Sequence, residues 1–167
     1  MAYIYPAPGV SAKQVTLSLT DSTSTLTGSL SVAALQDVTI NASNDVFTWT
    51  QLDSASKQNI ATTATNSLAM NLVLDKDSFF GTDDGDYANS TTVAGLGIFG
   101  MSNQKTKVGF SLYMGDESDG TEGVTITGSG YITGLAPTVS ADSPVWVSPI
   151  TITVDGDYTV DDTAIAP

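Results

Sequence analysis

The sequence predicts a mainly β fold, a β-sandwich or partly closed barrel that forms a single domain with one short helix. Apolar residues alternate with Ser and Thr through much of the 167-residue chain, which is the period of a half-buried strand. β-Branched residues recur along the whole chain, and they favour strands. Gly, Asn and Asp separate the alternating segments, so we expect about eight strands.

The alternating segments define the expected strands. The first is Val15–Thr20, in which every second residue is apolar. Seven further segments follow it: Leu26–Val32, Val38–Ile40, Val46–Trp49, Leu68–Leu74, Val108–Met114, Val124–Tyr131 and Pro144–Asp155. Asn41–Asp45 has turn chemistry, so we expect it to separate two strands. Residues 51–66 show no clear period, and we expect a long polar loop there with at most one helical turn. A phase change at Ser148 and Pro149 predicts a bulge or an edge strand.

The expected helix covers Thr91–Ser102 and ends at Asn103 or Gln104. Its apolar residues recur at helical spacing: Val93, Leu96, Ile98, Phe99 and Met101. Three glycines within it each weaken a helix by up to about 1 kcal/mol. We expect the chain to divide into an extended arm, residues 1–13, and a β domain, residues 14–167. Prolines oppose regular structure in the arm.

The composition excludes most of the side chains that enzymes use for catalysis. The chain has no Cys, no His and no Arg, so disulfides, thiolate nucleophiles, imidazole bases and bidentate phosphate recognition are all excluded. Its basic residues are five lysines: Lys13, Lys57, Lys76, Lys105 and Lys107. The net charge is −13, which repels nucleic acid and anionic membranes. We therefore expect a protein that is not an enzyme and that has no catalytic residues and no cofactor.

Two clusters of acidic residues are candidates for a calcium-binding site. The first contains Asp75, Asp77, Asp83, Asp84 and Asp86, and the second contains Asp116, Glu117, Asp119 and Glu122. Neither has the spacing of an EF-hand loop, and acidic turns between strands are ordinarily solvated, so we expect no metal site. A carboxylate pair flanked by Trp49 or Trp146 would suit a glycosidase. Both tryptophans lie in alternating segments, where a core or interface position is the simpler interpretation.

The order of elements from residue 91 onward is distinctive. A short Gly-rich helix, Thr91–Ser102, precedes a strand, Lys107–Met114, and a Gly-Asp turn leads into the phrase VTITGSGYITGL. The phrase PVWVSPITITVDGD follows. This order resembles the core of the major tail tube proteins of tailed bacteriophages. The resemblance covers most of the chain, and Leu26–Trp49 is compatible with the paired strands of that family.

The resemblance implies a structural subunit of a bacteriophage tail, a virion component made and assembled in the host cytoplasm. Six subunits would form a ring, and stacked rings would form a tube that conducts double-stranded DNA during ejection. Six copies at −13 each give −78, so we expect DNA to pass without sticking and carboxylates to outnumber lysines on the lumen wall. Expected partners are further copies of the chain and other tail proteins. Candidate subunit or ring contacts are Tyr3, Ile4, Tyr5, Leu52, Phe79 and Phe80.

Other functions fit the same composition. A capsid decoration protein or another virion structural β-protein would have a similar fold class. A carbohydrate- or calcium-binding β-sandwich module would use the tryptophans or the acidic loops, and a carboxylate-only hydrolase is the enzyme alternative. We expect no membrane binding, because no apolar run approaches the roughly 18 residues of a membrane-spanning helix and the first residues lack a signal peptide pattern.

Overall fold

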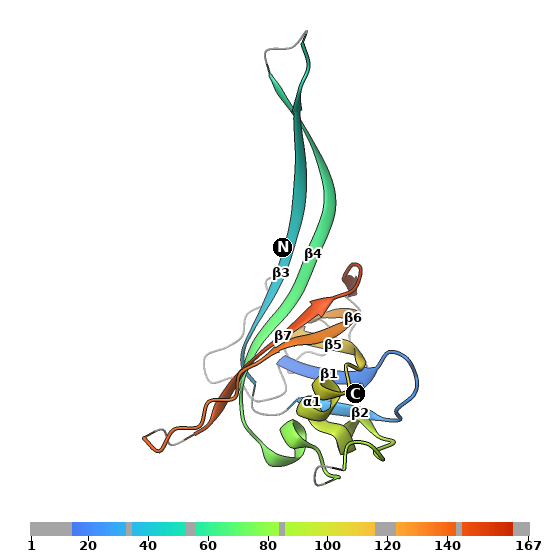
Figure 1. Ribbon diagram of the computed structural model, residues 1–167, viewed down its shortest axis with the longest axis vertical. Helices are drawn as coiled ribbons and strands as arrows, with labels where there is room; N and C mark the ends of the chain where they lie inside the picture. The colour runs from blue at the N-terminus through green and yellow to red at the C-terminus, as the bar shows by residue number, and fades with distance from the viewer. Residues whose placement is uncertain are drawn as a thin grey trace.

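A computed structural model describes residues 15–32, 35–52, 56–83, 86–115, 123–142 and 145–161 (Figure 1). The described strands are β1 (Val15–Asp21), β2 (Ser29–Val32), β3 (Leu35–Thr50), β4 (Lys57–Val73), β5 (Lys107–Gly115), β6 (Gly123–Leu135), β7 (Val147–Val154) and β8 (Thr159–Asp161). A π-helical turn, η1 (Lys76–Phe80), and a helix, α1 (Val93–Asn103), lie between β4 and β5. The predicted mainly β fold with one short α-helix is confirmed, and η1 is an addition that the sequence pattern did not indicate.

All the strands belong to one antiparallel sheet with the order β2-β1-β5-β6-β7-β4-β3, and β8 pairs with β6 beside this path. The two edge strands, β2 and β3, are consecutive in sequence. Val32 ends β2 and Leu35 begins β3, and three peptide units span at most about 11 Å. The sheet must therefore curl until its opposite edges approach each other at this corner. The fold is a partly closed barrel, and it is not a sandwich of two separate sheets.

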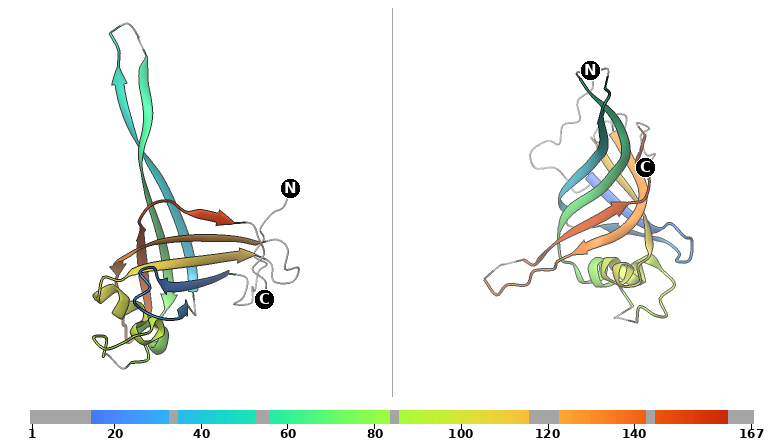
Figure 2. Two further views of the ribbon diagram at one scale, coloured as in Figure 1. Left: turned by 90° about the vertical axis from the view of Figure 1, so that its right-hand side faces the viewer. Right: turned by 45° about the horizontal axis from the view of Figure 1, so that its top comes forward.

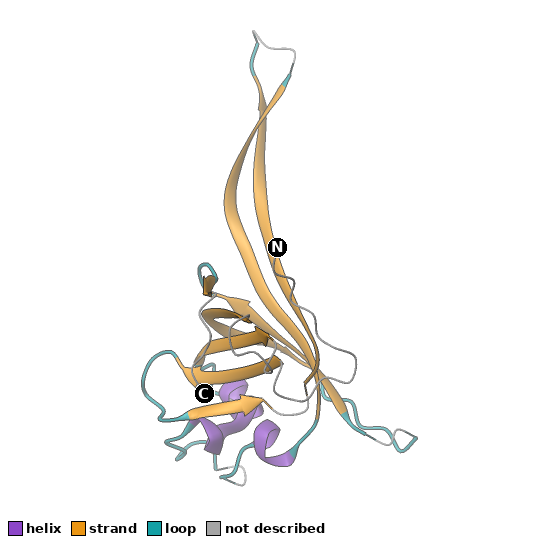
Figure 3. Cartoon of the chain, turned by 180° about the vertical axis from the view of Figure 1, so that it is seen from behind, coloured by secondary structure: helices purple, strands orange, loops and turns teal. Residues whose placement is uncertain are grey.

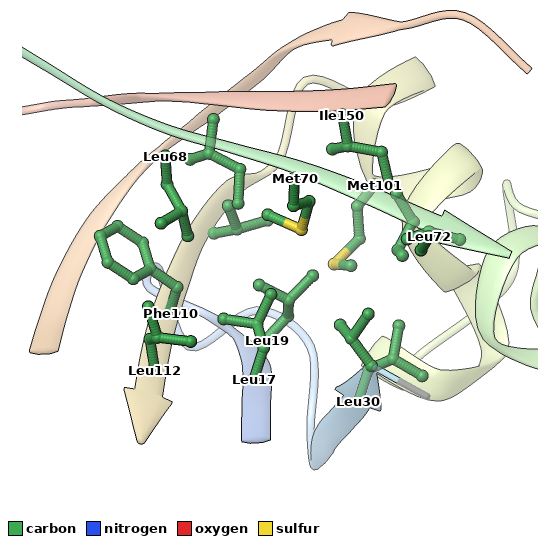
Figure 4. Close-up of a cluster of buried hydrophobic side chains, with 14 of the residues drawn as sticks. Leu17, Leu19, Leu30, Leu68, Met70, Leu72, Met101, Phe110, Leu112 and Ile150 are labelled. Atoms are coloured by element: carbon green, nitrogen blue, oxygen red, sulfur yellow. The ribbon is translucent and has the colours of Figure 1, made fainter. Parts of the chain in front are cut away.

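The core lies inside this curled sheet. The alternation seen in the sequence directs one side of every body strand inward, where burial stabilises a Leu or Ile by about 1.5–3 kcal/mol. Figure 4 shows side chains from β1 and β5 meeting those from β4 and β7. The fully or almost fully buried residues of this core include Leu17, Leu19, Leu68, Met70, Leu72, Phe110, Leu112, Ile150 and Ile152.

Helix α1 and turn η1 pack side by side and close one end of the core (Figure 1). The Thr92 hydroxyl accepts a hydrogen bond from Gly95 N at 3.0 Å, which caps the helix where it was expected to begin. Gln104 follows the last helical residue, as predicted. Gly97 has non-helical dihedral angles (φ 62°, ψ −178°), so α1 consists of two helical turns that meet at a kink. The kink changes the helical phase and leaves Phe99 37% exposed.

The region between residues 41 and 66 differs from its prediction. Asn41–Asp45 does not form a turn and residues 57–66 do not form a loop, because β3 runs through Thr50 and β4 starts at Lys57. The two strands pair with each other over most of their length. The outer parts of this pair bury neither side, so apolar alternation marks only Val46–Trp49, which was predicted as a strand and lies within β3. A hairpin of this kind is specified by cross-strand pairing, which periodicity in one strand does not reveal.

The irregularity expected at Ser148 and Pro149 lies in the partner strand. β7 is an interior strand with continuous register against β4, so it is neither bulged nor an edge. The register shift occurs in β6, between Ile132 and Gly134. Ser148 is fully buried, and its hydroxyl donates to Pro149 O at 3.1 Å. A buried Ser on the core side of β7 produces the apparent change of phase.

Candidate functional site

The most prominent surface of the molecule is the hairpin formed by the outer halves of β3 and β4. It extends far from the body, and no other described element lies beside its outer part (Figure 2 and Figure 3). Residues 42–50 and 57–65 are all exposed or nearly so. A two-stranded ribbon without a core is only marginally stable by itself in water. An arm of this length is therefore suited to contact with another molecule.

A β-bulge divides this hairpin. Thr62 and Thr63 stand opposite the single Asp45, and the register shifts there. The hydroxyl of Thr62 donates to Asp45 O at 3.2 Å, and that of Thr63 donates to Asp45 Oδ2 at 3.1 Å. The bulge offsets the two strands by one residue, so it determines which side chains share a face beyond it. Thr48 Oγ1 donates to Asn59 Oδ1 at 2.7 Å nearer the tip.

Beyond the bulge, one face of the hairpin carries an apolar strip formed by Phe47, Trp49 and Ile60. Phe47 is paired directly with Ile60, and its ring stacks on that of Trp49 with centroids 6.0 Å apart. Phe47 and Ile60 are 61% and 54% exposed. Contiguous exposed apolar side chains on an arm indicate a surface for binding protein. The sequence analysis gave Trp49 a core or interface position but did not select Phe47 or Ile60, although the alternation Phe-Thr-Trp outside any core was a usable signal.

Leu52 and Phe80, two of the predicted contact residues, are exposed. Leu52 lies two residues after the end of β3, near the hairpin tip, and its side chain is fully exposed. Phe80 is 41% exposed, and its ring centroid lies 5.8 Å from that of the half-exposed Phe99. Together with Tyr87, whose ring lies 6.2 Å from Phe99, these residues form a helix-side aromatic patch. Contacts through Leu52 and Phe80 remain predictions.

Phe79 requires a correction. Its side chain is fully buried within its own chain and packs edge-on against Phe80, with ring centroids 4.9 Å apart. A residue without exposed surface has nothing to offer a neighbouring subunit, so its predicted contact role is wrong. Phe79 is buried and Phe80 is exposed because neighbouring residues of η1 point in different directions. The arm residues Tyr3, Ile4 and Tyr5 lie outside the described residues.

The first acidic cluster serves local structure where it is described. The Asp75 carboxylate accepts hydrogen bonds from the Ser78 N–H and hydroxyl, both at 3.0 Å, and these bonds lower the pKa of Asp75. Asp86 accepts from Asn89 Nδ2 within a turn. The described parts of the chain bring together no group of three acidic side chains that could hold a metal ion. All four residues of the second cluster, Asp116, Glu117, Asp119 and Glu122, lie outside the described part.

A shallow pocket of about 240 Å³ lies between the β1–β2 loop and the start of β5. Its walls include Asp21, Gln104, Lys105, Lys107 and Tyr131. Lys107 Nζ is paired with Asp155 Oδ2 at 2.7 Å, and this hydrogen bond raises the pKa of Lys107. The groups present offer hydrogen bonding and charge, and the pocket walls contain no histidine or cysteine for nucleophilic chemistry.

The tryptophans do not lie in the core. Trp49 belongs to the apolar strip of the hairpin, and Trp146 is 51% exposed just before β7. A core position for either residue is therefore excluded, which leaves an interface as the simpler interpretation. No helix in the described part of the chain is long and apolar enough to cross a membrane.

No family model and no curated protein sequence matches the chain. Solved structures do match it. A chain from the tail of an empty gene transfer agent particle with C6 symmetry has a TM-score of 0.57 at 14% identity, over 86% of this chain and 93% of that one. A chain from the sheath/tube terminator of PVC, an extracellular contractile injection system, has a TM-score of 0.54 at 17% identity, over 96% of this chain and 99% of that one.

A chain from the baseplate of the anti-feeding prophage has a TM-score of 0.58 at 8% identity, over 91% of this chain and 95% of that one. These matches span nearly the full length of both partners in each comparison. The chain therefore has the fold of tail tube proteins from phage-like particles and contractile injection systems. The fold expected from the order of its elements is confirmed.

Proposed function

We propose that this chain is the structural subunit of a phage-like tail tube. Six copies form a ring, the rings stack into a tube, and the tube conducts double-stranded DNA. The observation that carries the proposal is the projecting β3–β4 hairpin with its exposed apolar strip, on a fold shared with tail tube proteins. The C6 symmetry of the gene transfer agent tail supports the ring of six.

The hairpin is the contact arm in this proposal. Phe47, Trp49 and Ile60 insert against a neighbouring subunit, and burial of their exposed surface stabilises the ribbon that the monomer leaves unsupported. Leu52 at the tip and Phe80 on the helix side extend the contacts. The N-terminal arm, residues 1–13, adds a further contact through Tyr3, Ile4 and Tyr5. The domain formed by residues 14–167 is the body of the ring.

The charge of the chain suits a tube through which DNA passes. Lys and Arg contacts to phosphates create deep, salt-dependent binding wells. This chain has no Arg and a net charge of −13, so an assembled ring has few cations to offer to DNA. The protein acts as a structural component of the virion tail, after synthesis in the host cytoplasm, and it catalyses no reaction.

Electron microscopy of the concentrated protein tests this proposal. We expect rings with six-fold symmetry and stacked tubes. A variant in which residues 43–65 are replaced by a two-residue Asn-Gly turn should fold and remain monomeric, because it keeps the described core and loses the arm. Dispersed monomers of the unaltered chain at every concentration would contradict the tube. Decoration of preformed capsids, or binding to glycans, would favour the alternative functions.

A further inference from the structure

The shallow pocket beside β5 brings together two of the five lysines of this acidic chain. Lys105 and Lys107 both line it, although the net charge of the chain is −13. Lys107 is paired with Asp155, whereas the ammonium of Lys105 forms no ion pair with another described residue. Lys105 is also exposed. The pocket therefore presents one cation that the described part of its own chain does not neutralise.

The carboxylate in the pocket wall, that of Asp21, is occupied by its own loop. Its two oxygens accept four hydrogen bonds at 2.6–2.8 Å, from the N–H and hydroxyl of Thr23 and from the N–H groups of Thr25 and Leu26. Four bonds use the roughly four acceptor positions of a carboxylate. Asp21 therefore holds the β1–β2 loop in place, and the pocket retains donors for another carboxylate.

The backbone at Lys105 is strained. Lys105 and Ser24 are the two non-glycine residues with positive φ in the described part of the chain, at 56° and 60°. Ser24 lies between two residues of the pocket wall. Thr106 N donates to Met101 O at 3.0 Å, so Lys105 occupies the left-handed position at which α1 ends. Gly is the usual residue there, because a Cβ atom is unfavourable. A lysine at this position keeps a cation in the pocket wall in spite of the strain, and strain of this kind gathers at functional sites.

The second acidic cluster lies at the opposite end of β5. Strand β5 begins at Lys107 and ends at Gly115, and residues 116–122 join it to the first residue of β6, Gly123. In the left panel of Figure 2, β5 starts beside α1 and points away from it. Carboxylates this close in sequence repel one another, and a nearby cation stabilises them. The joining segment carries four of them: Asp116, Glu117, Asp119 and Glu122.

This cluster cannot reach the pocket of its own chain. Strand β5 has nine residues, so its ends lie about 27 Å apart at roughly 3.3 Å per residue. A segment as short as residues 116–122, held at both ends, reaches back by at most about 14 Å. The cation and the carboxylates can therefore meet only between two copies of the chain. Because the two ends of β5 point in opposite directions, such a contact repeats by translation, and a contact that does not close on itself produces an open stack.

We propose that the pocket receives a carboxylate of the second acidic cluster from a copy in the next ring, with Lys105 as its ion-pair partner. This inference rests on the proposed function and names a contact that holds successive rings together. Copies with a charge of −13 repel each other along the stack, so a cation is needed where the rings meet. A single exposed ion pair contributes little, but equal pairs repeated around a ring act together.

Lys105→Gly separates this contact from the ending of the helix. Gly suits the positive φ, so the urea midpoint of the variant should be no lower than that of the parent. The protein concentration needed for tubes should rise at least tenfold, while rings still form in electron micrographs. Lys76→Gln removes the same charge from η1, and it should leave that concentration within about twofold of the parent. Equal assembly of Lys105→Gly and the parent would overturn the inference.

A crosslink identifies the two surfaces with every charge kept, because the chain has no cysteine. Thr106→Cys places a thiol in the pocket wall, and Ser118→Cys places one among the four carboxylates. The two variants are mixed, assembled into tubes and treated with a short bis-maleimide. We expect a covalent dimer with one copy of each variant in tubes, and none in separate rings or unassembled protein. Ala141→Cys, in an exposed loop, replaces Thr106→Cys in the matched control and should give no dimer.

The remaining outcomes are distinct from one another. Absence of the mixed dimer from tubes would remove the acidic cluster from the pocket. A mixed dimer in separate rings would place the contact between neighbours of one ring, and it would overturn the contact between rings. Absence of both rings and tubes from the unaltered chain is a different result, because it contradicts the proposed function itself.

Discussion

Gly81 and Gly97 touch through their backbones at the junction of η1 and α1. A Cβ atom on Gly97 would stand 2.4 Å from Gly81 N, and a Cβ on Gly81 would stand 2.1 Å from Gly95 O. Both residues have positive φ, 62° for Gly97 and 85° for Gly81. The close approach lets α1 kink over η1, and the kink places Leu96 and Ile98, which are only two residues apart, in the core together.

Gly97→Ala should therefore destabilise the fold strongly. The substitution adds backbone strain and a collision with backbone atoms that cannot move aside, so we expect a loss of about 3 kcal/mol or more. Urea denaturation measures it. Gly28→Ala is the matched control, because Gly28 also has positive φ but a Cβ there meets nothing within 4 Å. The control should lose about 1 kcal/mol. Equal losses for the two variants would mean that the contact with Gly81 is unimportant.

The apolar strip of the hairpin should be required for assembly and dispensable for folding. Phe47→Ser combined with Trp49→Ser removes exposed rings that pack on no core. The free energy of unfolding should therefore stay within about 0.5 kcal/mol of that of the parent. We expect the protein concentration needed for tube formation to rise more than tenfold, measured by sedimentation. Val46→Ser, on the other face of the same strand, should have a smaller effect. Unchanged assembly of the double variant would remove the strip from the interface.

The Asp21 carboxylate should make stability depend on pH at the acid end. Its burial disfavours ionisation, but hydrogen bonds from Thr23, Leu26 and Thr25 outweigh burial and hold the pKa of Asp21 below its usual value. Because the folded pKa is depressed, this contribution is present above the unfolded pKa of about 4 and is lost as pH falls through the folded pKa.

Asp21→Asn tests this contribution. The amide accepts through one oxygen only, so we expect a loss of about 1–2 kcal/mol at pH 7 and a shallower acid limb in the pH dependence of the unfolding free energy. An acid limb identical to that of the parent would assign the pH dependence to other carboxylates. Asp142→Asn, in an exposed loop, is the matched control.

Tyr158 should hold the C-terminal segment against the base of the hairpin. Its hydroxyl donates toward Ser67 O at 2.7 Å and Asn41 O at 3.0 Å, and burial raises the pKa of Tyr158. Tyr158→Phe removes the donor, so we expect a loss of about 1 kcal/mol in calorimetry or urea titration. Since the folded pKa is raised, this stability is present below pH 10 and is lost above it. The variant should lose that alkaline dependence, and its persistence would contradict the role of Tyr158.

The sequence alone determined which residues form most of the body strands and the helix. In Val15–Asp21 and Lys107–Gly115, strict alternation of apolar and small polar residues leaves one arrangement that buries the first set and exposes the second. Thr92 and Gln104 bound the helix through capping hydrogen bonds that depend on nearby residues only. Such local patterns are readable because each strand or helix carries its own period.

Tertiary structure decided the features that depend on distant partners. Ser111 and Thr153 share one face only because β5, β6 and β7 pair in a particular register. Phe79 and Phe80 are adjacent, yet packing around η1 buries the first and exposes the second. Phe47 and Ile60 meet across a hairpin whose strands lack the apolar period of a buried side. The physical reason is common to all three: periodicity records burial within one element, whereas register, curvature and projection arise from contacts between elements.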